Sequence, residues 1–529
     1  MYQIKFSLPP KTPASPQQLV DQAIALHQGG NLQRARDLYE QALRLHPGHA
    51  DALHLLGVVE YAQGNHEKAV ERITESVAIH PDNPAARLNL GNALRAIDRL
   101  AEAQAQYDAA LALNANYVNA LVAKAVVLDE LERWDESLAC FSEALALQGN
   151  SATTYFNRGN GYRKRGLWKQ AVADYDHALT LQPGFTQALL NRGSTYHEQL
   201  QLDRAVADFD AAIAAAPDHA EAHFNKALTL LLQGDFDAGL PLHEWRWKID
   251  SARGEERKFP QPQWMGHIPL SGKSILLHAE QGLGDSIQFV RYAPRLASAG
   301  ARVVLEVPIP LAGLLKRVQG VDTVVRRGEA LPTFDLHCPL LSLPLALGTR
   351  VDTIPAMGGY LSADAQRLAR WSAVLGPRTA AARVGLVWSG STWHTNDHNR
   401  SIRLTHMLAH LPVGPEYVSL QRDVRDSDLV TLAATTSLRH FGQDLIDFEE
   451  TAALCSLMDT VITVDTSVAH LAGALGKPTL LLLPYVPDWR WLLRRGDSPW
   501  YPSMRLLRQE CPGDWDSPLQ RAAQALTAV

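Results

Sequence analysis

The stretch ADALHLLGVVEYAQGNHEKAVERITESVAIHPDN (50–83) is one 34-residue unit of a repeat that determines the fold of the first half of the chain. Within this unit Gly57 and Ala69 are small, Ile73 is bulky and Pro81 stands close to the end. Small residues let two helices approach each other, the bulky residue fills the space between them, and the proline ends the second helix. The stretch therefore predicts a hairpin of two helices joined by a turn.

The same four positions recur along the chain at a spacing of 34 without an insertion. The four series are Pro47, Pro81, Pro183 and Pro217; Ala23, Gly57, Gly91, Ala125, Gly159, Gly193 and Ala227; Ala35, Ala69, Ala103, Ser137, Ala171, Ala205 and Gly239; and Tyr39, Ile73, Tyr107, Phe141, Tyr175 and Phe209. This period is typical of tetratricopeptide repeats (TPRs), and the resemblance covers residues 16–250. It predicts an all-α TPR superhelix of six full repeats and a degenerate seventh.

One polar position recurs on the face expected to line the concave groove of the superhelix. It holds Asn89, Asn157, Asn191 and Asn225, two residues before the second series. An asparagine amide both donates and accepts hydrogen bonds, so a row of them can pair with the backbone of an extended peptide. The row resembles the one in the superhelix of O-linked N-acetylglucosamine transferase, and we expect it to bind a protein or peptide acceptor. The alternative is that these asparagines only join neighbouring helices.

The composition narrows the class of protein. At 529 residues the chain is too long for one ordinary domain, and a net charge of -6 argues against a nucleic-acid binder with a broad basic face. Its four cysteines form no CxxC pair, which argues against a disulfide framework. Its start lacks the apolar core of a signal peptide, and its apolar runs fall far short of the roughly 20 residues of a membrane span. We expect a soluble, cytoplasmic protein without a membrane span.

After a linker at 251–271, short apolar strands alternate with helical stretches. This order implies parallel βαβ units, and a break near 376–382 separates two sets of strands. We therefore predict two Rossmann-like lobes, residues 272–380 and 381–529, the second ending in a C-terminal helix. The predicted strands are 274–278, 302–307, 323–325 and 334–337 in the first lobe, and 384–388, 417–420, 438–441, 461–464 and 479–483 in the second.

Ligands bind beyond the carboxyl ends of parallel strands, and three polar stretches occupy that position. The first is HAEQGLGDSIQFVRYAP (278–294), with Gly282, Gly284 and then Asp285 at the start of a helix. The second is VGLVWSGSTWHTNDHNRSIRL (384–404), a strand followed by a loop of small and polar residues. In the third, VITVDTSVAHLAGALGKPT (461–479), a buried strand leads into a helix whose free N–H groups favour a phosphate.

The third stretch carries a family resemblance. DTSVAHLA (465–472) resembles the nucleotide-sugar motif of heptosyltransferases, the family-9 glycosyltransferases of GT-B fold, and GLGD (282–285) resembles the glycine turn of that family with its catalytic aspartate. Together with PLLSLP, DWRW and SPWYPSMRL, these motifs resemble bacterial TPR proteins that carry such a domain, some linked to protein or flagellin glycosylation. Two features depart from the family: Ser467 replaces the usual glycine, and Arg400 is our substitute for a phosphate-binding lysine.

The resemblance implies an inverting, metal-independent glycosyltransferase that moves a sugar from a nucleotide sugar to a protein acceptor such as flagellin. Asp285 would be the general base that removes the proton of the acceptor hydroxyl. No metal or cofactor is expected, because fixed dipoles and a cation take the charge of the leaving nucleotide. The expected donor-binding residues are Gly282, Gly284, Ser389, Ser391, Arg400, Asp465, Thr466, Ser467 and His470. The resemblance does not determine which nucleotide the donor carries, or whether the sugar is a hexosyl, heptosyl or nonulosonyl group.

Several assignments have plainer alternatives. Asp285 caps its own helix in one of them, and Glu280 is a second candidate base. The cluster His394, Asp397 and His398 suggests a metal, but a polar loop without a further ligand argues against it.

The function of the whole chain also has alternatives. One is a catalytically inactive TPR scaffold or sensor that retains a transferase fold, and another is transfer to a lipid or polysaccharide. Arg490, Arg494 and Arg495 are expected on a solvated or interlobe face, with contact to an anionic donor as the alternative.

Overall fold

The structure is a computed structural model that describes residues 14–249, 256–394 and 396–527. By its internal contacts the chain divides into two compact units, Met1–Thr195 and Tyr196–Val529. The first unit contains helices only among the residues described, and the second contains both parallel sheets.

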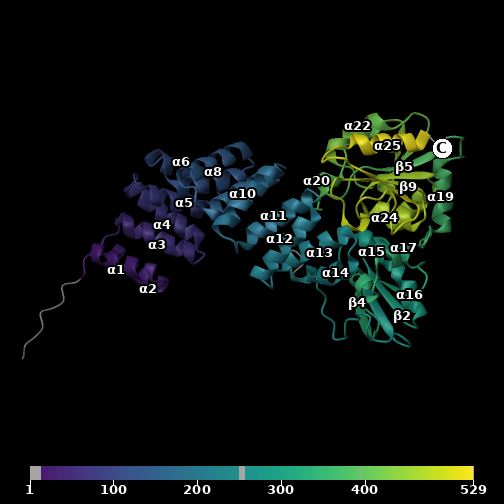
Figure 1. Ribbon diagram of the computed structural model, residues 1–529, viewed down its shortest axis with the longest axis horizontal. Helices are drawn as coiled ribbons and strands as arrows, with labels where there is room; N and C mark the ends of the chain where they lie inside the picture. The colour runs from purple at the N-terminus through teal and green to yellow at the C-terminus, as the bar shows by residue number, and fades with distance from the viewer. Residues whose placement is uncertain (1–13, 250–255, 395, 528–529) are drawn as a thin grey trace, which may run out of the picture. The chain divides into compact units, whose positions relative to one another are not determined.

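The first unit is a row of helix pairs in which each helix up to α10 contacts the next one along the chain (Figure 1). Its pairs are α1 (Pro16–Gln28) and α2 (Leu32–Leu45), α3 (Ala50–Ala62) and α4 (His66–Ile79), α5 (Pro84–Ala96) and α6 (Leu100–Leu113), α7 (Val118–Glu130) and α8 (Trp134–Leu147), and α9 (Ala152–Lys164) and α10 (Trp168–Leu181). Helix α11 (Thr186–Glu198) begins the sixth pair and spans the boundary between the units.

The spacing of small and bulky residues has the physical cause that the sequence predicted. A Cβ atom on Gly57 would lie 2.4 Å from the side chain of Ile73, and one on Gly91 would lie 2.4 Å from the ring of Tyr107. Ile73 and Tyr107 are fully buried. Each glycine therefore makes room for the bulky residue of the paired helix, and the predicted TPR fold is confirmed.

The second unit begins with the end of the helical region. It holds α12 (Leu202–Ala215), α13 (Ala220–Gln233), the short α14 (Phe236–His243) and the 3-10 helix η1 (Glu244–Lys248). Leu231, Phe236 and Leu240 lie in the same buried hydrophobic cluster as the first sheet, and Trp489 and Trp500 join them there. The last helix pair thus shares a core with the α/β region. The predicted domain boundaries at 250, 271 and 380 stay predictions.

Two parallel sheets form the rest of the second unit. The first has the order β3-β2-β1-β4, and the second has the order β10-β9-β8-β5-β6-β7. Their strands are β1 (Ser274–His278), β2 (Arg302–Val307), β3 (Thr323–Arg326), β4 (Leu336–Pro339), β5 (Arg383–Val387), β6 (Glu416–Ser419), β7 (Leu438–His440), β8 (Thr460–Val464), β9 (Thr479–Leu483) and β10 (Met504–Arg508). The sequence predicted nine of these strands within two residues at each end and missed β10.

Helices connect the strands, as expected for parallel pairs. They are α15 (Leu283–Phe289), α16 (Ala293–Ser298), α17 (Ile309–Leu315) and α18 (Leu343–Ala346) in the first lobe, then α19 (Ala365–Leu375), α20 (Asp397–Arg400), α21 (Leu404–His410), α22 (Asp426–Ala434), α23 (Phe448–Ser456), α24 (Ser467–Ala474) and the C-terminal α25 (Asp516–Thr527). The predicted class, helical repeats followed by an α/β region, is confirmed. Within the described residues, no helix combines the length and apolar composition that crossing a membrane requires.

Candidate functional site

The second sheet has the strand order of a doubly wound fold. From β5 the chain adds β6 and β7 on one side and then returns to add β8 on the other, so the switch point lies between β5 and β8. Ser389 follows the end of β5, and Asp465 follows directly after β8. Arg400, from the loop after β5, donates through Nη1 to the backbone oxygen of Asp465 at 3.0 Å. Two of the polar stretches therefore meet at the position where such folds bind ligands.

The glycine turn of the first sheet reaches the same place. Helix α15 packs against α24, as Figure 1 also shows. A Cβ atom on Gly284 would lie 2.7 Å from Cδ2 of His470 and 3.4 Å from Cα of Ser467. A side chain at Gly284 would therefore push these two helix starts apart. All three predicted stretches converge on the start of α24.

Asp285 stands in the first turn of α15 with both carboxylate oxygens engaged. Oδ2 accepts from the backbone N–H of Gly282 at 2.9 Å, and Oδ1 accepts from Nη2 of Arg490 at 2.6 Å. Burial raises the pKa of Asp285, and the Arg490 guanidinium opposes that rise. The helix cap that was the alternative for Asp285 is thus present, together with an ion pair.

Arg490 lies at this site, although the sequence analysis did not include it among the expected catalytic or donor-binding residues. It is buried, and besides Asp285 it binds Asp488 at 2.9 Å and the side-chain oxygen of Gln288 at 2.9 Å. It comes from η7 (Trp489–Trp491), in the motif DWRW, which places an aspartate two residues before an arginine. That spacing was the available signal. Of the two positions expected for Arg490, the solvated face is wrong because the side chain is enclosed, whereas its contact with Asp285 of the first lobe is the expected interlobe position.

The pKa values of Asp465 and His470 are strongly shifted from their usual values. Burial and the neighbouring Asp488 raise the pKa of Asp465 to about 6, while Arg400 and Arg490 act in the opposite direction. Burial lowers the pKa of His470 well below its usual value, and its Nδ1 lies 2.9 Å from the hydroxyl of Tyr501. Burial therefore favours the neutral ring of His470, and Tyr501 holds that ring in place.

The remaining predicted donor-binding residues differ in how open they are. Thr466, the N-cap residue of α24, and Ser467 are half-buried. The hydroxyl oxygen of Ser389 accepts a hydrogen bond from Gln421, and that side chain is buried. Ser391 lies on an exposed stretch of the loop. The start of α24 is thus partly open to solvent, whereas Ser389 is enclosed.

Glu280, the second candidate base, holds two segments of the fold together. It is buried and accepts from Nε and Nη2 of Arg246 at 2.8 and 3.0 Å. The backbone N–H of Leu341 donates to it at 3.2 Å. Burial raises the pKa of Glu280 and Arg246 lowers it. This carboxylate joins η1 to the turn that follows β4.

In the cluster His394, Asp397 and His398, which suggested a metal, two of the side chains form hydrogen bonds within the protein. Asp397 accepts from Arg425, and from the hydroxyl of Ser401 at 2.8 Å. His394 accepts at Nδ1 from the backbone N–H of Asn396 at 3.2 Å. These contacts account for the polarity of the loop.

The four groove asparagines are all half-buried. Asn89 contacts Nε2 of His54 at 2.8 Å, and Asn191 donates to the side-chain oxygen of Asn160 at 2.8 Å. The interhelix hydrogen bond that was the alternative is therefore present at these two positions. Asn157 lies on α9 and Asn225 on α13.

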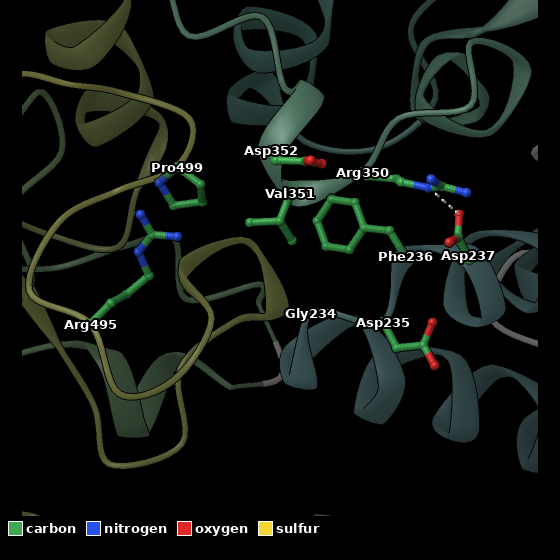
Figure 2. A pocket seen from close by; sticks show the side chains of 9 residues that line it. All are labelled: Gly234, Asp235, Phe236, Asp237, Arg350, Val351, Asp352, Arg495 and Pro499. Carbon is green, nitrogen blue, oxygen red and sulfur yellow. Dashed lines mark hydrogen bonds and ion pairs between the residues drawn. The ribbon is translucent and has the colours of Figure 1, made fainter.

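A cavity of about 500 Å³ lies elsewhere in the second unit. Figure 2 shows its lining, in which Arg350 and Asp237 form an ion pair of 3.0 Å. The lining residues are Gly234, Asp235, Phe236, Asp237, Arg350, Val351, Asp352, Arg495 and Pro499. Since acids and arginines share this lining and the predicted donor residues are not among it, we place the candidate site at the start of α24.

Comparison with known families defines the class of protein. A tetratricopeptide-repeat pattern matches residues 20–84 and 198–242, and a second such pattern matches residues 60–125. The pattern described as glycosyltransferase family 9 (heptosyltransferase) matches residues 442–492, which contain Asp465, His470 and Arg490. The chain is a TPR-repeat protein with a C-terminal match to glycosyltransferase family 9.

The chain is also similar in part to individual proteins. The chain is 27% identical over 327 residues to protein FlbA of Caulobacter vibrioides, covering 57% of this chain. It spans about half the length of that relative, 54%. Solved structures similar in part include a tetratricopeptide repeat protein from Parabacteroides merdae (16% identity, TM-score 0.38, 44% of this chain and 93% of that one) and YrrB, a TPR protein described as having an unusual peptide-binding site (23%, 0.30, 35% and 95%).

Proposed function

We propose that the chain is an inverting, metal-independent glycosyltransferase that moves a sugar from a nucleotide sugar to a protein acceptor bound by its TPR helices. The observation that carries this proposal is the convergence of Asp285, Arg490 and the start of α24 at the switch point of a doubly wound sheet. The match to glycosyltransferase family 9 over residues 442–492 supports it.

In this proposal the phosphates of the donor bind at the start of α24. The free N–H groups of a helix start and its dipole favour an anion there. Arg400, which already holds the backbone of Asp465, and Arg490 add positive charge beside it. These fixed charges stabilise the departing nucleotide without a metal ion.

Asp285 acts as the general base of a single displacement. Its carboxylate takes the proton of the acceptor hydroxyl while the hydroxyl oxygen bonds to the anomeric carbon. The bond from that carbon to the phosphate oxygen breaks, and its electron pair leaves with the nucleotide, so the configuration inverts. Burial favours this role because it raises the pKa of Asp285. A donor phosphate competes for Arg490 and thereby frees Oδ1 of Asp285 for the acceptor.

A thermal-shift screen against nucleotides and nucleotide sugars tests the donor site. A ligand that binds only the native state raises the melting temperature. We expect a rise with at least one nucleoside diphosphate, and its loss in Asp465→Ala/Thr466→Ala. Thr392→Ala, a change at an exposed position of the neighbouring loop that is not among the expected donor-binding residues, is the matched control and keeps the rise. An unchanged rise in the double variant rejects this donor site.

Acceptor binding is tested at Asn157 on α9. If the groove binds a peptide backbone, Asn157→Ala removes one hydrogen bond, worth about 1 kcal/mol, and raises the KM for a protein acceptor about fivefold. Hydrolysis of the donor stays unchanged. Asn89→Ala is the control, because that amide already contacts His54. Equal KM values for wild type and Asn157→Ala oppose acceptor binding at this position.

The engaged carboxylate of Asp285 favours a second candidate, a TPR scaffold that retains a transferase fold without turnover. Both oxygens of this carboxylate already have partners, Gly282 and Arg490. The two functions differ in one measurement. Donor hydrolysis or transfer by the purified chain supports the enzyme, whereas binding of a nucleotide sugar without turnover across a broad panel supports the scaffold.

A further inference from the structure

A second cluster of polar side chains lies away from the candidate donor site, where α21 meets α25. His406 and His410 are one helical turn apart on α21, and Asp516 is the first residue of α25. Oδ1 of Asp516 lies 2.7 Å from Nε2 of His406 and 3.1 Å from Nε2 of His410. A ligand atom from each of the three residues thus lies within 4.8 Å of the other two.

The hydrogen bonds of His410 determine which of its ring nitrogens carries a proton. Nδ1 of His410 lies 3.0 Å from the backbone oxygen of His406. A carbonyl oxygen only accepts, so Nδ1 must be the donor. In a neutral ring, Nε2 then presents its lone pair to the carboxylate oxygen of Asp516. Two electron-rich atoms at 3.1 Å repel each other unless a metal ion or a proton lies between them.

A histidine that donates one ring N–H to a backbone carbonyl is oriented in the way typical of metal ligands. Imidazole nitrogen and carboxylate oxygen are both ligands of Zn²⁺, at about 2.0–2.2 Å. Bonds of that length in a tetrahedral site separate the ligand atoms by about 3.3 Å, and the two nitrogen–oxygen distances in the cluster are 2.7 and 3.1 Å. Small side-chain shifts would therefore seat an ion.

We propose that His406, His410 and Asp516 bind a divalent transition-metal ion, with Zn²⁺ as the best-fitting ion. The side chain of Asp516 is 63% exposed and that of His410 is 19% exposed, which leaves an entry path and room for water as the fourth ligand. The ion joins the helix that follows the Arg400 loop to the C-terminal helix. Its role is structural, and it lies outside the metal-independent transfer proposed above.

The test uses the full chain with any affinity tag removed and metal stripped by a chelator. Titration with Zn²⁺ is followed by calorimetry and by the melting temperature, and Co²⁺ is used as a spectroscopic probe. We expect binding that saturates at one equivalent, a rise in melting temperature, and Co²⁺ absorption typical of tetrahedral coordination. In Asp516→Asn the affinity falls at least about tenfold, a loss on the scale seen when the surroundings of a metal site are disrupted.

Two further variants keep the outcome clear. His406→Gln/His410→Gln abolishes the one-equivalent binding, whereas the change His398→Gln, at an exposed histidine of α20, leaves it unchanged. If the double variant does not fold, the Co²⁺ spectra of wild type and Asp516→Asn decide alone. The proposal is overturned if these variants bind Zn²⁺ as wild type does. It is also overturned if wild type shows no metal response, in which case a proton on His410 holds the cluster together.

Discussion

The loop after β1 and the loop after β8 both place acidic residues at strand ends, but the charges around them differ. In the first loop, Glu280 and Asp285 each face a buried arginine, Arg246 and Arg490. In the second loop, the strongest charged neighbour of Asp465 is another acid, and its pKa rises to about 6. Burial raises the pKa at all three positions. The charge of the neighbouring residue therefore decides how far the pKa of each acid departs from its usual value.

The largest expected effect is on the rate of transfer, and it distinguishes Asp285 from Glu280. Asp285→Asn removes the proposed base, and we expect transfer to fall about 10⁴-fold, the upper end of general-base catalysis. The nucleotide-induced rise in melting temperature stays nearly intact, because Arg490 is freed rather than removed. Transfer kinetics and thermal shift on the same preparations check both points. Retained turnover disqualifies Asp285 as the base.

Glu280→Gln should instead act on stability. It takes one charge out of a buried ion pair with Arg246, and we expect the free energy of unfolding to fall by about 3 kcal/mol, the low end for such pairs because Glu244 still contacts Arg246. Denaturant unfolding measures this change, while transfer per folded molecule stays close to wild type.

A matched control for this variant is the exposed pair between Arg350 and Asp237, whose side chains are 65% and 66% exposed. Arg350→Gln should cost no more than about 1 kcal/mol. Equal losses of unfolding free energy in Glu280→Gln and Arg350→Gln would show that burial adds nothing to the ion pair of Glu280. Glu280 would then have no special structural role to set against the catalytic role proposed for Asp285.

Much of this architecture could be read from the sequence because its cause is local. The 34-residue spacing reflects contacts such as Gly91 with Tyr107 in the paired helix, and β1, β2 and β9 have the predicted bounds. Strand β10 was missed, since Arg505 and Arg508 interrupt its apolar residues.

The candidate site could be predicted only in part. The glycine turn and the start of α24 stand out as motifs, but the partner of Asp285 lies 205 residues further along the chain. His406 and Asp516 are 110 residues apart. Pairings over such distances are set by tertiary packing, which no local pattern contains.

The smallest expected effect concerns Asp465, whose native pKa of about 6 lies above the value of about 3.9 in an unfolded chain. Between these values the native state binds more protons, so raising the pH from 5 to 7 lowers stability through this residue. Asp465→Asn removes that cost. The melting temperature of the variant relative to wild type should therefore increase between pH 5 and pH 7, by about 2–4 °C.

Asp488→Asn sharpens this last measurement, because it removes the acid that adds to the pKa of Asp465 while leaving the carboxylate of Asp465 in place. In the Asp488→Asn background, the further change Asp465→Asn should alter the pH dependence of the melting temperature less than it does in wild type. If the two backgrounds respond alike, burial alone sets the pKa of Asp465. The contrast between the two loops would then lie in their arginines and not in the acid that neighbours Asp465.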